Sequence, residues 1–68
     1  MKIELAKDRD GYTAKVAGRK HLFAFGYTKQ EALEELASVG AAELENENEV
    51  ELLEKRVREA LHKIEHGD

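Results

Sequence analysis

The residues best suited to chemistry in this sequence are few and scattered. His62 and His66 stand four residues apart, a spacing that places two imidazoles on one side of a helix, where they could chelate a metal ion. A third ligand at a useful spacing is missing, and histidines near the end of a helix also complement the negative end of its dipole. We therefore expect no metal site and no other cofactor.

Acid–base and nucleophilic chemistry find equally little support. Asp8 and Asp10 fall in a turn-forming segment, where nothing desolvates a carboxylate and shifts its pKa. Ser38 has no histidine at a spacing that would activate its hydroxyl, and there is no glycine-rich phosphate loop. The sequence therefore predicts a protein that is not an enzyme.

Length and composition predict one small domain that needs help to be stable. The chain has 68 residues and no cysteine, so disulfides and thiolate metal sites cannot staple it. A domain of this size buries only about 60% of the surface that its unfolded chain exposes. Oligomerisation is the remaining common solution, which favours a homodimer or higher even oligomer. The sequence shows no signal peptide and no membrane span, so we expect a cytoplasmic protein with no membrane partner.

Charge is segmented along the chain. Residues 1–29 carry a net charge of +4, residues 30–54 a net charge of −9 from nine glutamates, and residues 55–68 a net charge of +1. An acidic block repels phosphate and favours a basic protein partner, although glutamate is also a good helix former that can simply solvate an exposed face.

Hydrophobic periodicity predicts an α+β fold. Residues 2–7, 12–17 and 21–27 alternate as strands, joined by turns at residues 8–11 and 18–20, which indicates a three-stranded antiparallel meander. In the first turn, Gly11 can take the positive φ of a bulged hairpin. Thr28 and Glu31 form a capping box that starts a helix. Gly40 either serves close packing or marks the end of this helix near Ala41 or Ala42. A second amphipathic helix follows, capped by Asn46 or Asn48 and stopped by Gly67. The order is β-β-β-α-α.

The third strand raises the question of what covers it. Residues 21–27 have apolar side chains on both faces and would lie at a sheet edge without charge or proline to protect it. One face should receive the first helix, and the other either the second helix, which would complete a monomer, or a second molecule. The predicted oligomer interface consists of Leu22, Phe23, Phe25, Val50, Leu53, Val57, Leu61 and Ile64.

A nucleic-acid surface is the alternative binding site. Basic side chains near an aromatic ring can hold phosphates and stack a base. The predicted RNA-contact residues are Tyr12, Lys15, Arg19 and Lys20. The acidic block makes nucleic acid the less favoured partner.

Two segments of the sequence form a recognisable pattern. One is the hairpin that enters the second strand at Asp10, Gly11 and Tyr12, and the other joins the third strand to the first helix through Gly26, Thr28, Glu31, Ala32, Leu33 and Leu36. Through these positions, residues 3 to about 40 resemble the N-terminal domain of the HicB-like antitoxin family. This resemblance implies a HicB-like domain at residues 1–44 with a partial RNase H-like fold. Residues 45–68 supply one amphipathic helix in place of the family's DNA-binding module, so a stand-alone domain is expected.

The resemblance also implies a function. HicB-like antitoxins oligomerise and neutralise a small basic toxin that cleaves messenger RNA. The acidic block would then occlude the RNA-binding face of the toxin, through Glu35, Glu43, Glu45 and Glu47. A small RNA-associated protein, or a domain whose partner is only itself, remains the alternative.

Overall fold

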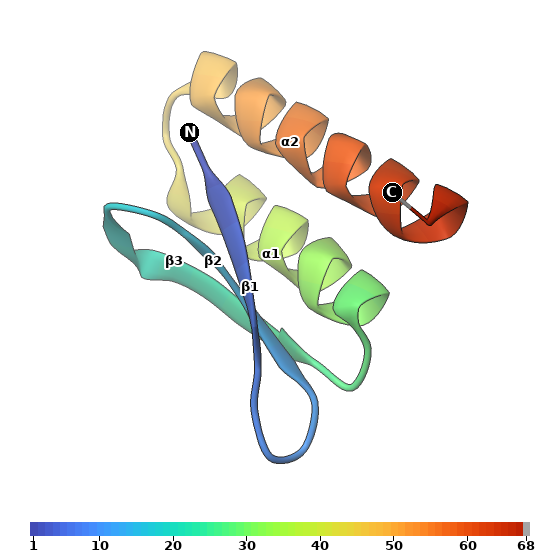
Figure 1. Cartoon of the computed structure of the whole chain (residues 1–68). Helices are drawn as coiled ribbons and strands as arrows, with labels where there is room; N and C mark the ends of the chain where they lie inside the picture. The colour runs from blue at the N-terminus through green and yellow to red at the C-terminus, as the bar shows by residue number, and fades with distance from the viewer. Residues whose placement is uncertain (68) are drawn as a thin grey trace.

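The computed structural model describes residues 1–67 and confirms the predicted α+β order (Figure 1). The elements are β1 (Ile3–Lys7), β2 (Tyr12–Val16), β3 (Arg19–Gly26), α1 (Lys29–Glu43) and α2 (Glu47–His66). The strands form one antiparallel sheet in the order β1-β2-β3, so β2 is central and β3 lies at an edge, as predicted.

The alternation of side chains separates the two faces of the sheet. Ala14 and Val16 of β2 and Leu22 and Ala24 of β3 are buried on the face that packs against the helices. Phe23 and Phe25 alternate with Leu22 and Ala24 and therefore lie on the opposite face. The sequence assigned these faces correctly.

The first part of β3 differs from the prediction. The segment at residues 18–20, expected to be a turn, contributes Arg19 and Lys20 to the strand, and the turn is confined to Ala17 and Gly18. Arg19 pairs with Val16 while Phe23 pairs with Lys15, so residues 20–22 form an irregular bulge. From Phe23 to Gly26 the pairing with β2 is regular.

The β1–β2 turn is held by the side chain of Asp8. Its Oδ1 accepts hydrogen bonds from the backbone N–H groups of Asp10 (3.0 Å) and Gly11 (2.8 Å). Gly11 does not take the positive φ that the sequence suggested. Instead, a Cβ at this position would collide with the carbonyl oxygen of Gly26, so close approach of the two backbones requires glycine here.

The capping box at the start of α1 is formed with one change of partner. The Thr28 hydroxyl accepts from the N–H of Glu31 at 3.0 Å, as predicted. The Glu31 carboxylate accepts from the N–H of Tyr27 (3.1 Å) rather than from that of Thr28. This pair of bonds fixes the end of β3 against the first turn of α1.

The second helix packs on the first. The side chain of Asn46 caps α2, and Gly67 ends it with φ 73°. Leu53 and Val57 of α2 are buried with Leu33 and Leu36 of α1 in the single core. Gly40 lies inside α1 rather than at its end. Glycine is needed there because the buried Leu53 side chain occupies the space that a Cβ would fill.

This arrangement places both helices on the same side of the sheet (Figure 1). The second helix does fold back onto its own chain, but onto α1 and not across the second face of the sheet. The cover expected on that second face is therefore not supplied by residues 1–67. None of the helices within those residues is both long enough and apolar enough to cross a membrane.

Candidate binding surface

The uncovered face of the sheet carries two adjacent phenylalanines. Phe23 is 45% exposed and Phe25 is 63% exposed, and their rings meet edge to face with centroids 5.8 Å apart. Large apolar side chains exposed side by side are typical of contact surfaces in a soluble domain. The other β2 and β1 side chains on this face include Lys15 and Glu4, which form an ion pair at 3.9 Å. The apolar part of the face is therefore concentrated along β3.

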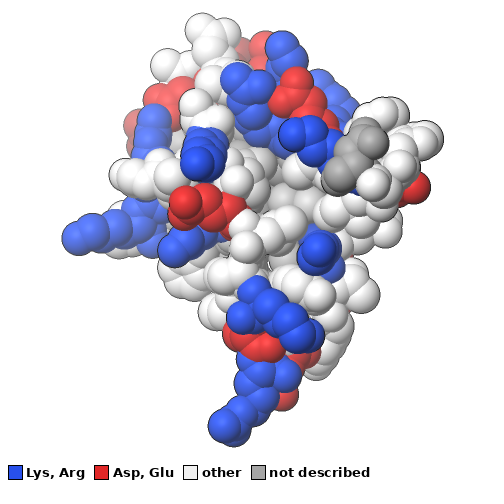
Figure 2. All heavy atoms as spheres, viewed as in Figure 1, with Lys and Arg blue, Asp and Glu red and all other residues white. Residues whose placement is uncertain are grey.

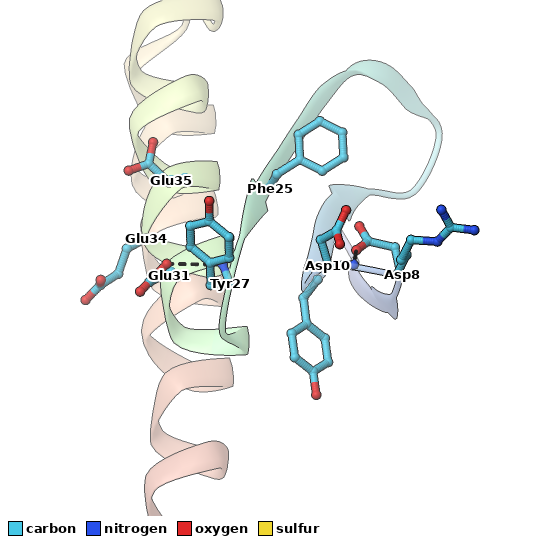
Figure 3. Close-up of a pocket in the computed structure, with 10 residues that line it drawn as sticks. Asp8, Asp10, Phe25, Tyr27, Glu31, Glu34 and Glu35 are labelled. Carbon is cyan, nitrogen blue, oxygen red and sulfur yellow. Dashed lines mark hydrogen bonds between the residues drawn. The ribbon is translucent and has the colours of Figure 1, made fainter.

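The end of this apolar stripe opens into a groove of about 720 Å³. Figure 3 shows Phe25 and Tyr27 in the middle, with Asp8 and Asp10 of the β1–β2 turn on one side and the glutamates of α1 on the other. The groove, which we call the acidic groove, is lined by Asp8, Arg9, Asp10, Tyr12, Phe25, Gly26, Tyr27, Glu31, Glu34 and Glu35.

The carboxylates of the acidic groove differ in whether they have hydrogen-bond partners. Those of Asp8 and Glu31 accept hydrogen bonds that hold the turn and the helix cap. Those of Asp10 and Glu35 have no hydrogen-bond or ion-pair partner within residues 1–67 and remain available to a ligand. Tyr27, at 80% exposure, presents its ring between them. An exposed ring beside carboxylates suits a guanidinium or ammonium group, which can stack on the ring and pair with the acid.

The structure divides the acidic face predicted from the sequence. Glu35 lines the acidic groove, whereas Glu43, Glu45 and Glu47 lie where α1 ends and α2 begins. Glu35 and Glu43 are separated by about 12 Å along the helix, because each residue adds about 1.5 Å. On the face of the molecule seen in Figure 2, acidic and basic side chains are mixed rather than gathered in one block.

The predicted RNA-contact residues do not all lie on one surface. Lys15, Arg19 and Lys20 line a shallow depression beside Phe23. Lys15 and Phe23 belong to the uncovered face, whereas Arg19 shares the helix side with its cross-strand partner Val16. Arg19 pairs with Glu49 at 2.7 Å, which neutralises part of this positive charge. Tyr12 lies on the helix side at the far end of β2, half-buried, with the Lys7 ammonium 5.2 Å from its ring centroid. Tyr12 therefore does not belong to the same surface as the other three.

The predicted interface residues fall into three groups. Leu22, Leu53 and Val57 are buried in the core of the single chain, so this part of the prediction does not describe surface residues. Val50 and Leu61 are half-buried on α2, and Ile64 is 38% exposed near its end. Phe23 and Phe25 are the strongly exposed members of the set.

The histidine pair lies at the end of α2. His62 and His66 place their rings 4.1 Å apart, centroid to centroid, on the last turns of α2. Across residues 1–67, no group of three potential metal ligands comes together.

Asp10, Tyr27 and Glu34 are among the groove residues that the sequence did not predict to bind a partner. They come from the β1–β2 turn, the loop after β3 and α1, so no local spacing connects them. The available signal was the position of Tyr27 directly before the helix cap, where the chain turns back and exposes its side chain.

Comparisons with family models, with curated proteins and with solved structures found no match. The class of protein is therefore described by its fold and its surface. The chain is a small β-β-β-α-α module with one covered and one open sheet face.

Proposed function

We propose that this protein is a protein-binding module that holds a basic segment of a partner protein in the acidic groove. The observation that carries the proposal is the placement of the exposed Phe25 and Tyr27 rings between the carboxylates of Asp10 and Glu35. An arginine side chain has the planar, weakly hydrated guanidinium that this combination of ring and carboxylate suits best.

The resemblance to HicB-like antitoxins gives the proposal its particular form. A small basic toxin that cleaves messenger RNA must present positive charge where it binds RNA. A module that covers this charge with Asp10, Glu34 and Glu35 would exclude the substrate. Of the glutamates predicted for the toxin contact, Glu35 supports this proposal through the groove, and Glu43, Glu45 and Glu47 would act as a second, separate contact.

The groove can be tested with a hexa-arginine peptide followed by NMR titration of the full chain. We expect shifts to concentrate at Phe25, Tyr27 and Glu35. Replacing Glu34 and Glu35 together by Gln should weaken binding by about two- to thirtyfold, since each exposed ion pair contributes about 0.2–1 kcal/mol. The matched control replaces Glu43 and Glu45 by Gln, which removes the same charge from the other end of α1.

Two results would count against the proposal. One is equal weakening in both double variants, which would mean that the peptide responds to net charge alone. The other is preferential, steeply salt-dependent binding of single-stranded RNA at Lys15, Arg19 and Lys20, which would favour the RNA alternative.

The antitoxin form has its own test. If the gene is accompanied by a reading frame for a small basic protein, co-expression should relieve the toxicity of that protein. The Glu34→Gln, Glu35→Gln variant should lose this protection while the control at Glu43 and Glu45 keeps more of it. Unchanged protection in both variants would place the toxin contact elsewhere.

A further inference from the structure

We propose that a second copy of this chain adds to the free edge of β3, forming a two-fold symmetric, six-stranded sheet. The proposal does not depend on the identity of a basic partner. It follows from the distribution of regular backbone, apolar side chains and charge along β3.

The single chain exposes more surface than a monomeric protein of its mass, which supports an interface with a second copy. A monomeric protein of 7.7 kDa is expected to expose about 4,300 Å² of solvent-accessible surface. This chain exposes 4952 Å², which is roughly 600 Å² more. A stable interface buries about 800 Å² on each partner, so the excess exposed area is close to the area that one chain buries in a dimer.

The edge of β3 is open to pairing in one part and protected in the other. Residues 20–22 form the bulge, and bulges and charges discourage a neighbouring strand. The four residues from Phe23 to Gly26 are regular, and no side chain among them is charged. A second strand should therefore pair with this part of the edge.

Antiparallel pairing centred on Ala24 satisfies the side chains on both faces. It places Phe23 opposite Phe25 of the second copy, twice, so the exposed rings form cross-strand aromatic pairs. On the helix side, Ala24 meets Ala24 of the second copy at the axis, and Gly26 lies opposite Leu22. The small size of Ala24 and Gly26 lets the two α1 helices approach.

The same register also matches charges. Beyond the paired segment, the bulge that carries Lys20 in one copy lies toward the start of α1 in the second copy, whose first two turns carry Glu31 and Glu35. Lys20 has no ion-pair partner within residues 1–67, and neither does Glu35. The basic start of β3 thus faces the acidic groove of the second copy, in two equivalent contacts as two-fold symmetry requires. Because Phe25 and Glu35 serve both contacts, a basic peptide and a second copy should compete.

Sedimentation equilibrium of the full chain from micromolar to millimolar concentration tests the dimer. We expect a monomer–dimer equilibrium. Phe25→Ser should weaken the dimer about tenfold or more, as expected for an aromatic side chain at the centre of an interface. Ile64→Ser, which removes an exposed apolar side chain on α2, should leave the dimer unchanged. A single-chain mass throughout the range, or a dimer lost through Ile64→Ser and kept in Phe25→Ser, would overturn the proposal.

A charge exchange tests the register without touching the apolar contact. Lys20→Glu and Glu35→Lys should each weaken the dimer severalfold, and the double variant should restore it. A double variant as weak as the product of the two single effects would refute the pairing of these residues. The Lys20→Glu variant keeps the acidic groove intact, so its peptide binding shows whether the proposed function survives when the dimer does not.

Discussion

Packing of α2 against Gly40 can be tested by a double-mutant cycle between Gly40 and Leu53. In the wild-type background, Gly40→Ala gains about 1 kcal/mol of helix propensity, but its new methyl collides with the buried Leu53 side chain. Such overpacking costs about 1–3 kcal/mol, so the variant should be as stable as the wild type or up to about 2 kcal/mol less stable. Leu53→Ala alone should cost about 2–5 kcal/mol by leaving a cavity.

The two substitutions should not be additive. With Leu53 already shortened to Ala, the methyl introduced by Gly40→Ala meets empty space, and the substitution gains its full helix propensity of about 1 kcal/mol. Gly40→Ala should therefore be about 1–3 kcal/mol more favourable in the Leu53→Ala background than in the wild type. The assay is urea unfolding followed by circular dichroism at one fixed protein concentration, because self-association would shift the apparent stability. Additivity within about 0.5 kcal/mol would refute this packing and with it the position of α2.

Three further substitutions test the local geometry. Thr28→Ala should lower the free energy of unfolding by about 0.5–2 kcal/mol through loss of the α1 cap. Ser38→Ala also removes a hydroxyl, but from within the helix, and should not lower it. Equal losses in the two variants would contradict the role of Thr28 as a cap. Gly11→Ala should destabilise the protein because its Cβ meets the Gly26 carbonyl, and a thermal midpoint equal to that of the wild type would contradict this close approach. The hydrogen bond from Arg56 lowers the pKa of Glu59. The small stabilisation from this pair is therefore fully present above the ordinary glutamate pKa and is lost as pH falls through the lowered pKa. In an NMR pH titration, Arg56→Gln should raise the pKa of Glu59, and an unchanged titration would contradict this cause.

The sequence was sufficient to predict the elements and the two faces of the sheet. Alternation with period two assigned Leu22 and Ala24 to one face and Phe23 and Phe25 to the other, and the structure confirms this. The caps at Thr28 and Asn46 are equally local, because each depends on residues two or three positions away.

Features that depend on distant contacts were beyond the sequence. The apolar face of α2 could pack equally well against the first helix or against the sheet. The space that Gly40 leaves for the Leu53 side chain places α2 against α1. Gly11 suggested a positive φ, while its actual constraint is the backbone of Gly26 on another strand. The acidic groove escaped prediction because Asp10, Tyr27 and Glu35 meet only after the turn, β3 and α1 have packed.

Our central proposal is that this protein contacts other chains through the free edge of β3 at Phe23 to Gly26 and the exposed rings beside it. Amide hydrogen exchange across a dilution series measures this most directly, because a paired edge protects backbone N–H groups and a free edge does not. We expect protection of the N–H groups between Phe23 and Gly26 that point away from β2 to increase with protein concentration, while protection in α2 stays constant. Protection of these N–H groups that does not change with concentration, and does not respond to a basic peptide, would contradict the proposal.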